Sequence, residues 1–297
     1  MMTEEELLNE LRSVAADQRD GLAIYALLDS AIYAGATMDE SGKRYGNLAL
    51  VLADAKPESL FVYAFDDERT DASPLLVSIR DLDGELAKRI ATLALEYHLA
   101  SWIWSPLPAQ ALARHLAAFI RAKFRASAAM LRPYDPRVME DTIACLDPGR
   151  QAALWEPVFA WAYFDEGGAV KQLQRPEVRP TSRVAVPLVL DDEEQGRLEG
   201  LASRIALQTY IETHAPSVME PLSLAQRKAF CVQQIGIGER LRVQSMGDLL
   251  IVAALSGAYG GQWIDEEAIQ PLARSVFDGT VSLALVATEI TDRLGHN

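Results

Sequence analysis

The sequence has few of the residues around which metal and redox sites are built. Two cysteines and four histidines occur in 297 residues, with no Cys-x-x-Cys pair and no two histidines three or four positions apart. A thiol redox motif or a helical zinc site requires such spacing. The sequence therefore predicts no metal and no other cofactor. Cys145 and Cys231 lie in apolar surroundings and are predicted to be buried free thiols of a reducing compartment.

Sequence motifs for nucleotide binding and acyl transfer are missing too. Gly236-Ile237-Gly238 begins like a dinucleotide loop, but it has no third glycine and lies between predicted helices instead of after a strand. Neither a phosphate-binding loop ending in Gly-Lys-Ser/Thr nor a Gly-x-Ser-x-Gly elbow occurs. We interpret the protein as a binding protein and not as an enzyme.

Basic residues and long apolar runs are also scarce. The chain has 42 acidic against 28 basic side chains, a formal net charge of −14, whereas nucleic-acid binding needs a basic face. No apolar run approaches the length of a membrane span, and the first residues are acidic where a secretory signal would be basic. We predict a cytoplasmic protein that binds neither nucleic acid nor membrane.

Short apolar runs, by contrast, are abundant up to residue 170. Six of them are typical of strands, over 24–28, 60–65, 75–79, 102–104, 128–131 and 158–164. Helical periodicity separates most of these runs, for example over 82–97 and 105–124. We predict an α+β (α/β-like) fold in which residues 1–170 form a lobe with a mixed or largely parallel sheet covered by helices.

The chain changes character after residue 170. Prolines punctuate residues 171–187, which lack helical periodicity and are interpreted as a linker. From 188 to 297 every pattern is helical, which predicts a smaller all-α C-terminal lobe. Ser223 to Gln226 has the form of a capping box, and Gly236 is the expected end of that helix.

The most distinctive segment is Arg132-Pro133-Tyr134-Asp135-Pro136-Arg137, which we call the corner. Each proline disfavours the helical conformation in the residue before it. Asp135 followed by Pro136 has the form of a helix start, with Asp as N-cap. We expect a strand, a stiff corner and a helix, with Arg132, Tyr134, Asp135 and Arg137 presented between them.

Two interpretations of the acidic residues near the corner stay open. Asp29, in an apolar strand, could join Asp135 and His98 in the carboxylate/histidine cleft of a hydrolase-like enzyme. In the alternative, Asp29 accepts backbone N–H groups at a turn, and Asp135 caps its helix while meeting Arg132 or Arg137. A buried carboxylate is costly unless it is paired in this way.

Four segments together have the features of one known family. They are the corner, Tyr25 to Ala31, Ser105-Pro106 with Arg114 to Leu116, and Trp155 to Trp161. These segments resemble the type VI secretion effector-chaperone family, the Tap/TEC adaptors. The resemblance covers about residues 22–165 and is weaker over the C-terminal lobe, while Ala100-Ser101-Trp102 departs from the aromatic or glycine that the family often has there.

The resemblance implies an adaptor that uses no cofactor. Such a protein binds the N-terminal part of one toxic effector in the cytoplasm and promotes its loading onto the VgrG spike. A cleft between the two lobes would hold the effector segment, although a scaffold that self-associates through the helical lobe is an alternative. An exposed aromatic residue beside an arginine suits a partner-binding hot spot, with core packing as the competing explanation. The candidate partner-binding residues are Arg132, Tyr134, Asp135, Arg137, Trp155 and Trp161.

Overall fold

The structure, a computed structural model, describes residues 2–17, 21–38, 46–66, 72–124, 127–165, 167–177 and 186–295. The chain divides into two compact units, Met1–Leu198 and Glu199–Asn297, and each is described by itself. The division falls within helix α9 (Asp192–His214). The linker expected over 171–187 stays a prediction, but its first two residues belong to strand β8 (Val170–Gln172), and its residues 178–185 lie outside the described ranges.

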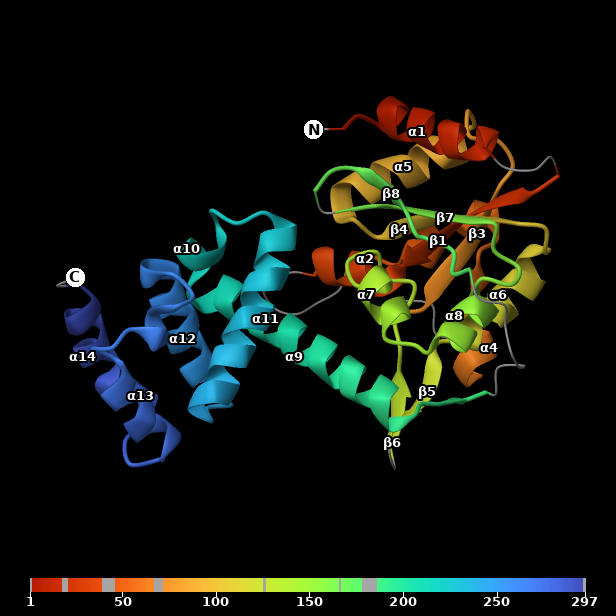
Figure 1. Cartoon of the computed structure of the whole chain (residues 1–297). Coiled ribbons are helices and arrows are strands. Elements are labelled where there is room, and N and C mark those ends of the chain that lie inside the picture. Colours follow the sequence, from red (N-terminus) through yellow and green to blue (C-terminus); the bar gives the residue numbers. More distant parts are fainter. Residues whose placement is uncertain are drawn as a thin grey trace. The chain divides into compact units, whose positions relative to one another are not determined.

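The first unit is built on a six-stranded sheet with the order β2-β3-β1-β4-β7-β8 (Figure 1). Its strands are β1 (Ala23–Asp29), β2 (Glu58–Ser59), β3 (Pro74–Ile79), β4 (Ala100–Ser105), β7 (Ala160–Phe164) and β8 (Val170–Gln172). All neighbouring pairs are antiparallel. The α+β class is confirmed, but the expectation of a largely parallel or mixed main sheet is wrong. β3 and β4 do run in the same direction, yet β1 lies between them and pairs with both.

Strand residues alternate between two apolar faces of this sheet. Tyr25 and Leu27 of β1 belong to one core cluster, whereas Ala26 and Leu28 belong to the other, as the two-residue period of a strand requires. Helices α1 (Glu4–Ala16) and α5 (Glu85–Tyr97) cover the second face (Figure 1). Because both faces are buried, the strands read as continuous apolar runs.

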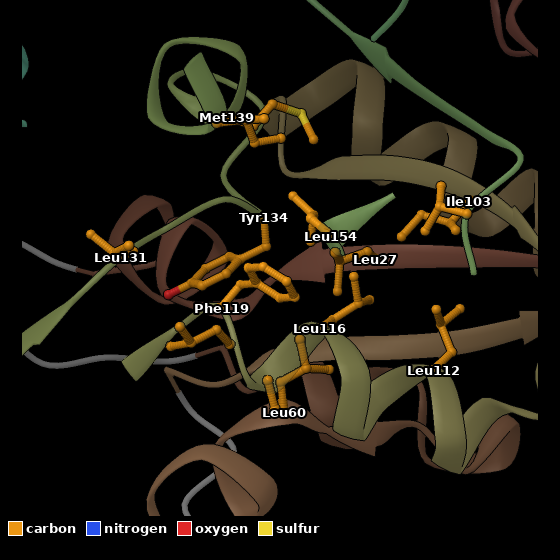
Figure 2. Close-up of a cluster of buried hydrophobic side chains, with 14 of the residues drawn as sticks. Leu27, Leu60, Ile103, Leu112, Leu116, Phe119, Leu131, Tyr134, Met139 and Leu154 are labelled. Carbon is orange, nitrogen blue, oxygen red and sulfur yellow. The ribbon is translucent and has the colours of Figure 1, made fainter. Parts of the chain in front are cut away.

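Four helices cover the first face of the sheet. They are α4 (Leu60–Phe65), α6 (Ala109–Ala117), α7 (Met139–Ala144) and α8 (Pro148–Leu154). In Figure 2, Leu60, Leu112 and Leu116 point toward Leu27 of the central strand. Three short helices pack against the second core cluster as well: α2 (Ser30–Ala36), α3 (Leu48–Val51) and η1 (Ala53–Ala55).

Two segments differ from their predicted type. Residues 60–65, expected as a strand, form α4, in which Phe61 and Phe65 are one turn apart with ring centroids at 5.3 Å. Six consecutive apolar residues carry no period, so sequence alone does not separate helix from strand there. The helix expected over 105–124 ends at Ala117, and Arg121–Phe124 is strand β5.

Strand β5 lies at the centre of a second, three-stranded sheet. It pairs antiparallel with β6 (Ser127–Met130) and parallel with β9 (Leu188–Val189). The mixed character predicted for the main sheet is therefore found in this smaller one. Strand β6 leads directly into the corner. Between them, the Leu131 N–H donates a hydrogen bond to the Ile120 carbonyl at 2.8 Å.

The elements of the second unit are all helices among its described residues, as predicted. The predicted lobe began at 188, however, and Leu188–Val189 forms strand β9 in the first unit. After α9 come α10 (Pro216–Met219), α11 (Leu224–Leu241), α12 (Met246–Tyr259), η2 (Trp263–Asp265), α13 (Gln270–Phe277) and α14 (Leu283–Gly295). The capping box at Ser223 and Gln226 is confirmed. The expected stop at Gly236 is wrong: an interior glycine costs only about 1 kcal/mol, and α11 continues to Leu241. Within the described ranges, we find no helix with both the length and the apolar composition to span a lipid bilayer.

Gly238 allows close approach between α11 and α12. A Cβ atom at this position would lie 2.5 Å from Leu249 Cδ2 and 3.1 Å from the Val243 carbonyl oxygen. We expect Gly238→Ala to lower the free energy of unfolding by about 1–3 kcal/mol, because a well-packed contact must shift. Urea denaturation would measure the change.

The matched control is Gly236→Ala in the same helix, where no atom lies within 4 Å of the added Cβ. Alanine is the better helix former, so this control is expected to stabilise the protein by about 0.5–1 kcal/mol. Equal effects of the two substitutions would show that the contact with α12 does not constrain position 238.

Candidate partner-binding site at the corner

The corner is a run of tight turns between β6 and α7. The Asp135 carbonyl accepts hydrogen bonds from the N–H groups of Val138 at 3.0 Å and Met139 at 2.8 Å. Helix α7 begins at Met139 with Val138 as N-cap, so the expectation that Asp135 is the N-cap is wrong. The Asp135 side chain instead accepts from the Arg137 N–H at 3.1 Å, which closes an Asx turn.

Asp29 lies at the end of β1 and is fully buried. Its Oδ1 accepts from the N–H groups of Ala31 at 2.9 Å and Ile32 at 3.4 Å, so Asp29 is the N-cap of α2. Its other oxygen, Oδ2, accepts from Arg132 Nη2 at 2.5 Å. The prediction that Asp29 accepts backbone N–H groups at a turn is confirmed.

Asp135 is held by two guanidinium groups. Arg132 Nη2 lies 3.2 Å from Asp135 Oδ2, while Arg137 donates from Nη2 to Oδ2 at 2.9 Å and from Nε to Oδ1 at 3.0 Å. Arg132 thus bridges the two buried carboxylates, and Arg137 makes a bidentate pair with one of them. We call Asp29, Arg132, Asp135 and Arg137 the corner network.

The electrostatics of the network keep its arginines charged. Burial by itself would lower the pKa of Arg132, but Asp29 and Asp135 outweigh burial and hold that pKa above its usual range. The hydrogen bonds with Asp135 likewise raise the pKa of Arg137. Two arginines therefore face two carboxylates in a site where an unpaired charge would be costly.

Tyr134 turns its ring into the core. It is 2% exposed and lies beside Phe119 in the cluster that Figure 2 shows, with Leu131 and Met139 nearby. The Arg132 guanidinium carbon is 5.9 Å from the ring centroid. Burial raises the pKa of the Tyr134 phenol well above its ordinary value. Of the corner candidates, only the side chains of Arg132 and Arg137 are substantially exposed, at 33% and 40%.

Trp155 and Trp161 also lie in the core and not at the surface. They are 2% and 1% exposed, and their ring centroids are 6.2 Å apart. Trp161 Nε1 donates to Ser101 Oγ at 3.0 Å, which satisfies the indole in the interior. Both tryptophans therefore fit core packing, the competing explanation, and neither forms an exposed aromatic hot spot in this structure.

The structure brings together Asp29 and Asp135, the two carboxylates of the hydrolase-like alternative, but it does not bring His98 to them. His98 ends α5 at φ 51° and stacks on Phe164, with ring centroids 5.3 Å apart. Among the described residues, no hydrogen bond or ion pair joins His98 to Asp29 or Asp135. Both carboxylates are buried and accept from arginines and backbone N–H groups, so neither presents a free oxygen to a substrate as a general base must. The same described ranges hold no group of three or more potential metal ligands.

A third buried carboxylate, Glu194, lies outside the corner network and is not evident from the sequence. It lies in the first turn of α9, fully buried, and accepts from the N–H groups of Asp147 at 2.8 Å and Asp191 at 2.9 Å. An ion pair with Arg150 of α8 completes its partners. The signal that the sequence offers is the spacing from Asp191 to Glu194, which fits a capping box.

His115 makes the stability of the first unit depend on pH. Its Nε2 lies 2.9 Å from the Leu154 carbonyl oxygen, and burial lowers its pKa below the ordinary value. The unfolded chain therefore takes up a proton near pH 6.5 that the folded protein resists, so stability falls as pH drops through that value. We expect the loss of unfolding free energy from about pH 7.5 to 5.5 to be smaller in His115→Gln. Urea denaturation at both pH values tests this, and an equal loss in both proteins would contradict it.

Comparison with known proteins gives one match. A family model described as a domain of unknown function, DUF4123, matches residues 24–153. The matched segment begins in β1 and ends in α8, so it contains all four residues of the corner network. It lies within the span of about residues 22–165 on which the resemblance rests. No curated protein and no solved structure matches the chain.

Proposed function

We propose that the protein is a type VI secretion adaptor that binds the N-terminal region of one cognate toxic effector in the cytoplasm and promotes its loading onto the VgrG spike. The observation that carries this proposal is the DUF4123 match over residues 24–153, because that domain is associated with effector adaptors of this secretion system and not with catalysis. The motif resemblance over the same segment supports it.

The corner network suggests how the domain meets its partner. Asp29, Asp135 and Tyr134 are buried, whereas the side chains of Arg132 and Arg137 are partly exposed. A rigid carboxylate base fixes each guanidinium, so little side-chain entropy is lost when a partner binds. We assign the partner contact at the corner to these two arginines, and Arg137 is the more exposed of them.

Arg137→Ala is expected to weaken effector binding about tenfold while the protein stays folded, since an interfacial arginine contributes about 1–2 kcal/mol. Asp135 keeps its contact with Arg132 in this variant, at 3.2 Å in the parent structure. Isothermal titration calorimetry with the purified N-terminal region of the effector would measure the affinity. Tyr134→Ala does not serve this test, because Tyr134 is a core residue.

The matched control for Arg137→Ala is Arg80→Ala, which removes the same charge from an exposed position after β3. Both variants are expected to give the parent circular dichroism spectrum and a cooperative thermal transition. If Arg137→Ala binds the effector as tightly as Arg80→Ala does, the corner is not part of the interface.

The function itself is tested by purifying the tagged full-length protein from its native host while the secretion system is expressed. Mass spectrometry is expected to find one near-stoichiometric partner with a toxin-like domain, with or without the spike protein. Recovery of the protein alone under those conditions would count against the adaptor function. A stable assembly of the protein with itself alone would favour the scaffold alternative.

A further inference from the structure

The second unit carries a small groove between the end of α11, η2 and α13. Its volume is about 180 Å³, and its lining includes Arg240, Ile264, Gln270, Arg274 and Phe277. Gln270 Nε2 donates to the Ile264 carbonyl at 3.0 Å, which fixes one wall. We call this feature the arginine groove, and every residue that lines it belongs to the unit Glu199–Asn297.

Positive charge gathers at the arginine groove although the chain has a net charge of −14. Arg274 is exposed, and within the described residues its guanidinium makes no ion pair or hydrogen bond. Arg240 pairs with Asp265, and both side chains are about half exposed. The Arg242 guanidinium lies 4.0 Å from the centroid of the Phe277 ring. Two arginines thus line the groove, Arg240 and Arg274, and Arg242 stacks on the lining residue Phe277.

The size and the walls of the groove restrict what it can hold. Sites for whole small-molecule ligands typically measure about 300–1,000 Å³, so about 180 Å³ suits one or two side chains. Leu241 and Ile264 form buried apolar parts of the lining, whereas Phe277 is 38% exposed. The complementary ligand therefore carries a carboxylate beside an apolar side chain.

We propose that the arginine groove binds an acidic, partly apolar peptide segment of a protein partner. A carboxylate of the segment binds the free Arg274 guanidinium, which is shaped for bidentate pairing, and an adjacent apolar side chain packs on Phe277. This inference does not rest on the adaptor function, since it follows from the charge, size and lining of the groove.

Asp265 is an internal competitor for the same ligand. It occupies the Arg240 guanidinium, so a carboxylate entering the groove meets its negative charge as well as the two arginines. Removing that charge while keeping the side-chain shape, as in Asp265→Asn, frees Arg240 for the ligand. The groove therefore offers one substitution that should weaken binding and another that should strengthen it.

The test titrates the full-length protein into a fluorescein-labelled ten-residue peptide of alternating Glu and Leu, read by fluorescence anisotropy at about 50 and 150 mM salt. The matched probe has Gln in place of each Glu. We expect the Glu peptide to bind about tenfold more tightly than the Gln peptide, and more weakly at the higher salt. Arg274→Glu should reduce the affinity about tenfold or more, and Asp265→Asn should increase it several-fold.

Arg80→Glu is the control for net charge, because it makes the same change at an exposed position of the other unit. Arg274→Gln is a second variant that removes the charge without reversing it and should also lose binding. The proposal is overturned if the parent protein does not bind the Glu peptide at about 1 mM, if both peptides bind equally, or if Arg274→Glu and Arg80→Glu bind alike.

Discussion

Arg132→Met is expected to lower the free energy of unfolding by about 3 kcal/mol or more, as loss of one partner from a buried ion pair typically does. Methionine keeps much of the apolar stem but removes the charge that bridges Asp29 and Asp135. Asp135 retains Arg137, whereas Asp29 keeps only the N–H groups of Ala31 and Ile32. The side chain of Asp29 has no exposed surface in the parent, so its charge depends on Arg132 and these two N–H groups.

The loss of unfolding free energy in Arg132→Met should depend on pH. Burial already holds the pKa of Asp29 above its unfolded value of about 3.9 in the parent, and Arg132 opposes that effect, so the loss of Arg132 raises the pKa further. A group with a raised folded pKa stabilises the fold below the unfolded pKa and loses that contribution as pH rises through the folded value. The variant should therefore be closest to the parent near pH 4. Urea denaturation followed by tryptophan fluorescence at about pH 4 and 7 measures both quantities.

The matched control is Arg137→Met, which leaves Asp135 in contact with Arg132. Its cost should be about 1 kcal/mol, because the Arg137 side chain is 40% exposed and its ion pair is partly solvated. Asp29→Asn combined with Arg132→Met should recover part of the loss, since the buried charge is gone. If Arg132→Met costs no more than Arg137→Met, the bridge between the carboxylates is not a major source of stability.

Trp155→Ala is expected to cost about 3–5 kcal/mol of unfolding free energy, the usual range for removing a large aromatic side chain from a core. Trp155 is 2% exposed and packs against Trp161, so the loss comes from a cavity and lost apolar burial. Trp155→Phe, which keeps a ring, should cost less than half as much. Thermal unfolding of the three proteins gives the comparison.

Trp155→Ala also separates core packing from partner binding. The effector affinity per folded molecule should equal that of the parent, once the folded fraction is known from circular dichroism. If Trp155→Ala stays as stable as the parent yet loses effector binding, Trp155 contacts the effector and does not act through core packing.

The sequence predicted the elements that carry an unambiguous local signal. The apolar run of β1, the capping box at Ser223 and the stiff corner are all present. Pairing between Asp135 and an arginine also followed from the cost of burying a carboxylate. In each case, the deciding interaction lies within a few residues or follows from burial alone.

The remaining features depend on contacts between distant residues. The run over 60–65 becomes helix α4 because it packs on α6 and the sheet, which no local period reveals. Strand order is also non-local: inserting β1 between β3 and β4 makes the main sheet antiparallel. The role of Glu194 is non-local too, because its partners Asp147 and Arg150, at the start of α8, lie more than forty residues earlier.

The central position of β1 has a consequence for synthesis of the chain. It is the first of the described strands to leave the ribosome, yet Ala26 pairs with Val77 on one side and Trp102 on the other. Until β3 and β4 have emerged, an apolar strand has both edges open, and such edges invite pairing with other chains. Sheets that close through distant partners also fold slowly. The nascent first unit is thus most prone to aggregation while translation runs from β1 to β4.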